Sequence, residues 1–176
     1  MKNTICMYAQ HLREKHQAIY ALLDTLSNEE REKDRGSYYK SISGLFRHCI
    51  SGMYFFLGIY KTALEAGSAA AKTIDAIKDC SIPDGALTGA QWTALKPVME
   101  AISVGFVDFA AALRDDEFNA SVNVEWYGGN PPAVPLSFMI HQLIVHTVHH
   151  QGQISQILDE MNIENNYSGI NVKFIA

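Results

Sequence analysis

Residues 136–161 read LSFMIHQLIVHTVHHQGQISQILDEM, and this stretch indicates the fold most directly. Its apolar side chains recur at intervals of three and four residues, which is the period of an amphipathic helix. The same spacing recurs over residues 4–27, 38–66 and 91–114. Helices of this length bury their apolar faces by packing against one another. The sequence therefore predicts an all-α fold, a four-helix bundle.

Polar stretches mark the predicted ends of the first two helices. The first helix is followed by NEEREKDR at 28–35, which we expect to be a solvated loop that stops at Gly36. Ser37 is then placed to cap the second helix, and Gly67 to end it. Residues 68–79, SAAAKTIDAIKD, are expected to continue as helix before the next loop.

A different period appears ahead of the last helix. Val122, Val124 and Trp126 alternate with polar residues, which is a strand signal, and GGNPP at 128–132 follows as a turn. Residues 133–136 can return as a second strand, so we expect a small β-hairpin before the last helix. Because no repeat or linker divides the chain, residues 1–176 are predicted to form a single domain.

Composition narrows the class of protein. Hydrophobic residues make up 48% of the 176 residues, and the formal net charge of -5 disfavours nucleic acid and anionic lipid as partners. Cysteines at 6, 49 and 80 lack a CxxC pair, which fits a reducing compartment. The N-terminus becomes charged too early for a signal peptide, and we expect no stretch able to span a membrane. A cytoplasmic protein is therefore predicted.

Four of the seven histidines fall within ten positions of the last helix: His141, His146, His149 and His150. His146 and His150 are four residues apart, so they lie one turn apart on one helical face. Two imidazoles at that spacing can bind one metal ion, by the geometric logic of HExxH helices. Gln142 and Gln153 extend the same face by one turn in each direction. His141 and His149 lie off this face and are expected to point to solvent or polar neighbours.

His48 is the candidate third ligand. It lies midway along the second predicted helix, in the most apolar part of the chain, FRHCISGMYFF. Helix bundles build metal sites from inward-facing groups on different helices. Three imidazoles with water in the remaining position form the open arrangement of a reactive metal. The alternative is structural: a core His48 satisfied by a neighbouring acceptor, chance spacing on the last helix, and a simple dimeric bundle.

The stretch HTVHHQGQI at 146–154 resembles the HxxxHRGQI signature of the DinB/YfiT-like superfamily of metal-binding four-helix bundles. Residues 34–57, DRGSYYKSISGLFRHCISGMYFFL, resemble the second helix of that family. The resemblance implies that His48, His146 and His150 bind one divalent ion, with nickel or zinc as the first candidates. It also implies a homodimer.

Two departures from the family pattern stand out. Gln151 occupies the position where the family usually has arginine. An acidic residue often found about one turn after the helix-two histidine is absent, because residues 51–53 are serine, glycine and methionine. These departures leave the three expected metal ligands in place, but the family pattern then gives no basis for inferring the substrate.

The resemblance implies a metal-dependent enzyme acting on a small molecule. Relatives include transferases and isomerases that use a low-molecular-weight thiol such as bacillithiol, mycothiol or glutathione. Hydrolysis by metal-bound water is a variant with the same ligands, and Gln153 or His149 would orient the bound molecule. The alternative is a non-enzymatic metal-containing ligand-binding or stress-response protein. A thiol enzyme predicts polar or basic groups at the mouth of a cavity beside the metal, and a sequestering protein predicts a mostly apolar pocket.

Overall fold

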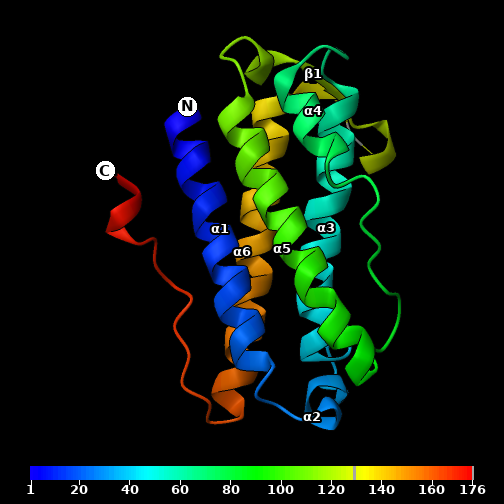
Figure 1. Cartoon of the computed structure of the whole chain (residues 1–176), viewed down its shortest axis with the longest axis vertical. Helices are drawn as coiled ribbons and strands as arrows, with labels where there is room; N and C mark the ends of the chain where they lie inside the picture. Colours follow the sequence, from blue (N-terminus) through cyan, green and yellow to red (C-terminus); the bar gives the residue numbers. More distant parts are fainter. Residues whose placement is uncertain (129, 176) are drawn as a thin grey trace.

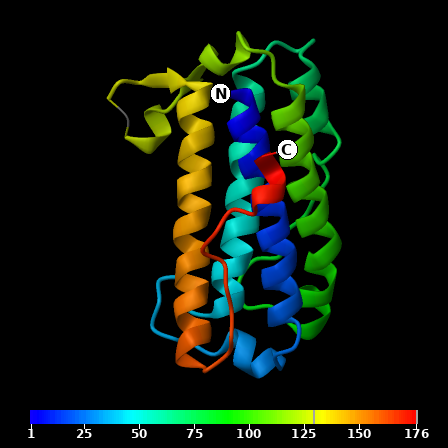
Figure 2. The same cartoon turned by 90° about the vertical axis from the view of Figure 1, so that its left-hand side faces the viewer.

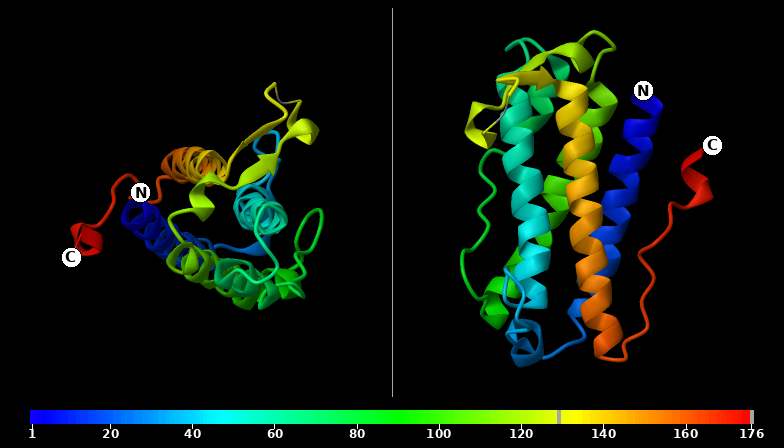
Figure 3. Two further views of the ribbon diagram at one scale, coloured as in Figure 1. Left: turned by 90° about the horizontal axis from the view of Figure 1, so that it is seen from above. Right: turned by 180° about the vertical axis from the view of Figure 1, so that it is seen from behind.

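The computed structural model describes residues 1–128 and 130–175 and is mostly helical (Figure 1). Four long helices run alongside one another: α1 (Lys2–Leu23), α3 (Ile42–Thr62), α5 (Gly89–Ala112) and α6 (Leu136–Glu160). α1 packs on α5, and α3 packs on α6 and α5. All four contribute side chains to one hydrophobic core, and Figure 3 shows them end-on around it. The predicted helix-rich fold is confirmed.

α3 begins at Ile42, later than predicted. Ser41, not Ser37, is the N-cap residue, and its side-chain oxygen accepts a hydrogen bond from the Gly44 amide at 3.0 Å. Residues 37–40 instead form a tight turn in which Lys40 has a φ of 68°, a left-handed conformation that a right-handed helix cannot contain. The predicted start was therefore wrong by four residues, and α3 also ends before Gly67.

The charged run after α1 was expected to be a solvated loop, and that expectation was wrong. It contains α2 (Asn28–Glu32), whose N-cap Ser27 accepts a hydrogen bond from the Glu30 amide at 3.1 Å. Arg31 is buried, with its guanidinium 4.7 Å from the centre of the Trp92 ring. It also donates to the Leu23 carbonyl at 3.3 Å. A cation–π contact and backbone acceptors at the end of α1 replace water around this charge.

The connection between α3 and α5 contains the expected additional helix. α4 (Ala69–Asp75) is capped by Ser68 and packs against α5. A long loop then returns to the opposite end of the molecule, so α3 and α5 run in the same direction (Figure 1). α5 starts with a capping box in which Thr88 and Gln91 each bond to the other's backbone amide.

The predicted hairpin is present, but its first strand is shorter than predicted. β1 (Ser121–Asn123) pairs antiparallel with β2 (Ala133–Pro135), with Val122 opposite Val134. It follows a 3₁₀ turn, η1 (Glu117–Asn119), and leads into another, η2 (Glu125–Tyr127), so the strand prediction through Trp126 was wrong. The Trp126 indole N–H donates to the Asn123 carbonyl at 3.0 Å. Gly129 of the predicted turn lies outside the described residues.

The expectation that no stretch is long and apolar enough to span a membrane was wrong, because α3 meets both criteria. Among the described residues it is the one helix that passes by length and composition, with a mean hydropathy of 1.2 over its most apolar window. However, 56% of that window is buried inside the structure, as in the core helix of a soluble protein. The same helix carries His48.

The chain after α6 folds back along α1 (Figure 2) and ends in η3 (Val172–Ile175). Lys173 and Glu14 form an ion pair with a nitrogen–oxygen distance of 2.5 Å. Lys15 donates to the Asn166 carbonyl at 3.3 Å. The tail, α1 and α6 together border a cavity of about 450 Å³.

Candidate metal centre

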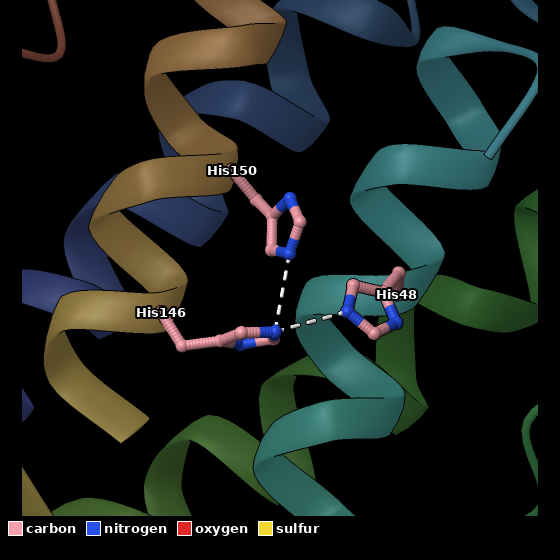
Figure 4. Close-up of side chains that lie close together, drawn as sticks. All are labelled: His48, His146 and His150. Carbon is pink, nitrogen blue, oxygen red and sulfur yellow. Dashed lines mark hydrogen bonds between the residues drawn. The ribbon is translucent and has the colours of Figure 1, made fainter. Parts of the chain in front are cut away.

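The three predicted ligands come together between α3 and α6. His48 lies two turns into α3, while His146 and His150 lie one turn apart on the facing side of α6. Figure 4 shows the three imidazoles pointing toward one another from the two helices. The four-residue spacing, which puts two side chains on one helical face, thus produces the arrangement that the sequence predicted.

The distances between the ring nitrogens suit one metal ion. His48 Nε2 lies 3.2 Å from His146 Nε2, and His150 Nε2 lies 3.1 Å from the same atom. All three donor atoms are within 4.8 Å of one another. Three nitrogens at Zn–N distances of 2.0–2.1 Å around a tetrahedral ion would be separated by about 3.3–3.4 Å. Two of the three separations are therefore close to the spacing that a metal ion requires.

Gln153 fixes the tautomer of His150. Its amide oxygen lies 2.6 Å from His150 Nδ1. Because an amide oxygen can only accept, Nδ1 carries the ring proton and Nε2 presents its lone pair to the cluster. Metal-bound histidines commonly use their second nitrogen in this way. The sequence had placed Gln153 on the correct face, and the structure gives it a definite contact.

Hydrogen bonds among the three rings cannot satisfy both of their close contacts. His146 Nε2 faces two other Nε2 atoms, yet a neutral imidazole nitrogen carries at most one proton. One proton can serve only one of the two contacts, which leaves lone pairs opposed. A cation at the centre would accept all three lone pairs at once. The donor set therefore fits a divalent ion.

The electrostatic environment keeps these imidazoles neutral. Burial lowers the pKa of His48 to about 4, with additional repulsion from His150 and His146. Burial, followed by the neighbouring histidines, also lowers the pKa of His146. For His150, burial lowers the pKa and outweighs the opposing effect of the hydrogen bond that its Nδ1 donates to Gln153. Since only the neutral imidazole has a free lone pair, the site is in its metal-binding form at neutral pH.

Sequence reasoning missed Tyr39, which contacts two of the three histidines. Its hydroxyl oxygen lies 2.8 Å from His48 Nε2, and its ring stacks on the His48 ring with centroids 4.0 Å apart. It meets the His150 ring edge-on at 5.4 Å. Burial raises the pKa of the Tyr39 phenol. A tyrosine two residues before the N-cap of the histidine-bearing helix is the only signal in the sequence.

The remaining candidates lie outside the cluster. His141 and His149 are exposed, as predicted, although the His149 ring reaches to 5.0 Å from that of His150. Cys49 is buried, and burial raises the pKa of its thiol to about 12, so it packs as a small core residue. Gln142 lines a separate apolar pocket near Phe56.

Comparison of the sequence with models of protein families identifies the family of this chain. The model described as DinB family matches residues 1–164 of the chain. The chain belongs to the DinB family. The resemblance read from the HTVHHQGQI stretch is thereby confirmed. Searches of curated proteins and of solved structures found no match.

The two departures from the DinB pattern occupy different places. Gln151 is buried and lines the cavity beneath the tail, together with His11 and Tyr167. Its Nε2 has no hydrogen-bond partner among the described residues. Gly52, one turn after His48, borders the cluster: a Cβ built there would lie 3.6 Å from His146 Cε1. A side chain at position 52 would therefore stand against His146, whereas Gln151 lies at the tail cavity.

Proposed function

We propose that this DinB protein holds one divalent metal ion on His48, His146 and His150 and is a metal-dependent enzyme of the thiol-transferase, isomerase or hydrolase type. The observation that carries the proposal is the convergence of three Nε2 atoms, two of them 3.2 and 3.1 Å from the third. Nickel and zinc are the first candidates, because both accept imidazole nitrogen.

An ion held by three protein ligands keeps a position open for another molecule. Such an ion, held by His48, His146 and His150, would lower the pKa of a thiol or water and make it nucleophilic at neutral pH. The chain's own contribution is to exclude water and to hold the imidazoles in one orientation. Gln153 does this for His150 through the 2.6 Å contact with Nδ1. Phe56 shields His146, with ring centroids 6.3 Å apart.

A groove of about 460 Å³, lined by both polar and apolar side chains, supports the thiol reaction. It starts at Gln153 and His149 and extends to Arg35 and Ser37. Arg35 pairs with Glu30 at 3.0 Å, yet its Nε has no hydrogen-bond partner among the described residues. A low-molecular-weight thiol carries carboxylate and amide groups that such a groove can recognise. Arg35 and Gln153 are the polar and basic groups that we propose for recognition of the thiol.

The proposal is tested by thiol conjugation. Protein loaded with Ni²⁺ or Zn²⁺ is incubated with glutathione and 1-chloro-2,4-dinitrobenzene. The thiol sulfur bonds to the ring carbon, and chloride and the thiol proton leave. We expect conjugation above the uncatalysed rate, lost in His146→Ala and retained in His141→Ala, which changes an exposed histidine of the same helix. Bacillithiol, mycothiol and water are tested as alternative nucleophiles, and inactivity with all of them in a metal-loaded protein would refute the enzymatic proposal.

A non-enzymatic ligand-binding protein is the second candidate, and an apolar pocket favours it. This pocket, of about 180 Å³, is lined by Phe56, Val134, Phe138 and Met139 beside the hairpin. It is mostly apolar, as the sequestering hypothesis requires. Binding of a ligand to the metal-loaded protein without its conversion would support this alternative.

The remaining proposals concern assembly. We propose that the four long helices form a DinB-type bundle and that two copies associate as a homodimer in the cytoplasm. Exposed apolar side chains on α6, Val145 and Val148, offer a surface for the second copy. Light scattering coupled to size-exclusion chromatography tests this: a mass of one chain would refute the dimer.

A further inference from the structure

Tyr39 reaches the histidine cluster from a segment that carries none of the three ligands. Its hydroxyl oxygen lies 2.8 Å from His48 Nε2, the atom assigned to the metal. Its ring stacks on His48 at 4.0 Å and meets His150 edge-on at 5.4 Å. The phenol therefore stands at the edge of the space enclosed by the histidines.

The backbone holds Tyr39 firmly in this place. The turn at 37–40 is closed by the Lys40 amide, which donates to the Ser37 carbonyl at 2.9 Å, and the Ser41 amide donates to the Tyr39 carbonyl at 2.8 Å. Gly44 on α3 lets the Tyr39 carbonyl approach so closely that a Cβ at Gly44 would lie 2.2 Å from its oxygen. The approach is possible only because residue 44 has no side chain.

Metal binding changes the partner available to the Tyr39 hydroxyl. Once an ion takes the lone pair of His48 Nε2, that nitrogen can neither donate to the hydroxyl nor accept from it. The hydroxyl then needs a new acceptor in a partly buried place. The molecule at the open coordination position is such an acceptor, because it presents sulfur or oxygen lone pairs.

We propose that Tyr39 donates a hydrogen bond to the sulfur or oxygen atom of the molecule that occupies the open coordination position. This inference rests on the proposed metal site. It assigns Tyr39 a role in binding the thiol or water. The role is distinct from metal ligation, which His48, His146 and His150 perform.

The test measures ligand binding without measuring activity. Wild-type, Tyr39→Phe and Tyr38→Phe proteins are loaded with Co²⁺ and titrated with 2-mercaptoethanol, and the sulfur-to-cobalt charge-transfer absorption is followed. Tyr38 is the matched control because it is the adjacent tyrosine of the same turn and is 89% exposed. Phenylalanine at 39 keeps the ring and removes only the hydroxyl.

We expect Tyr39→Phe to weaken 2-mercaptoethanol binding about tenfold, the effect of one lost hydrogen bond. Its Co²⁺ affinity should fall by less than about threefold, since the three ligands remain. Tyr38→Phe should match the wild type in both. Equal 2-mercaptoethanol affinity in Tyr39→Phe and wild type would overturn the inference. A parallel loss of cobalt affinity and of the unfolding midpoint would also overturn it, because it would show a structural role. Failure of the wild type to take up Co²⁺ would instead refute the metal site itself.

Discussion

Replacing Gly44 by alanine should destabilise the protein, although the same change stabilises most helices. Gly44 lies in the first turn of α3, and its amide donates to the N-cap Ser41 at 3.0 Å. A Cβ built there would lie 2.2 Å from the Tyr39 carbonyl oxygen and 3.2 Å from Ser41 Oγ. The atom in the way is backbone, so no side-chain rotation relieves the overlap.

The magnitude follows from these distances. Alanine gains about 0.5–1 kcal/mol over glycine in a helix. To bring the new contact out to 3.0 Å, the turn at Tyr39 and the helix must move apart by at least 0.8 Å. Overpacking of this kind costs about 1–3 kcal/mol, and disturbing the serine cap costs up to about 1 kcal/mol more. Taken at the middle of each range, these terms leave a net loss of about 2 kcal/mol in the free energy of unfolding.

The assay is urea unfolding followed by far-ultraviolet circular dichroism, with Gly58→Ala as the control. Gly58 lies in the same helix, and a Cβ there meets no atom of the described residues within 4 Å. The control should be more stable than the wild type by about 0.5–1 kcal/mol. A Gly44→Ala protein as stable as the control would refute the close approach of Tyr39 to α3, and with it the reason given for the position of its phenol.

Two further predictions concern single side chains. Burial lowers the pKa of His16 to about 4, below its value of about 6.5 in the unfolded chain. At pH 5 the unfolded chain therefore binds a proton that the folded chain excludes. The contribution of neutral His16 to the free energy of unfolding is complete above about pH 6.5 and is lost as the pH falls toward 4. Between pH 7 and pH 5 the free energy of unfolding should fall by about 2 kcal/mol because of His16. Urea unfolding should therefore show a flatter pH profile for His16→Asn than for the control His141→Asn. Equal profiles would contradict the lowered pKa assigned to His16. Gln153→Ala should weaken metal binding by about 10-fold or more, because it removes the hydrogen-bond partner of His150 Nδ1. Gln156→Ala is the control and should leave the metal affinity unchanged. Isothermal titration with Zn²⁺ measures the affinity of each variant, and equal affinities would show that Gln153 does not orient the His150 ring.

Local periodicity predicted the elements that depend on neighbours in sequence. Apolar spacing located the four long helices, and the spacing of His146 and His150 placed both on the face that meets His48. Each of these follows from side chains three or four residues apart, which a sequence displays directly.

The missed features depend on contacts between distant segments. Arg31 was predicted to be solvated because the surrounding run is charged, but Trp92, far along the chain, covers it. Tyr39 could not be assigned, because its position depends on the left-handed Lys40 and on the close approach of Gly44. Neither is visible in a periodic pattern, since serine, tyrosine and lysine are all compatible with a helix.

The most direct test of the metal centre is elemental analysis of protein purified without an affinity tag or chelator. Wild type is compared with His48→Ala and His150→Ala, and with His141→Ala as the exposed-histidine control. The proposed site predicts about one equivalent of a transition metal per chain in the wild type and control, lost in the other two variants. A wild-type protein that is metal-free and takes up no metal on addition would contradict it.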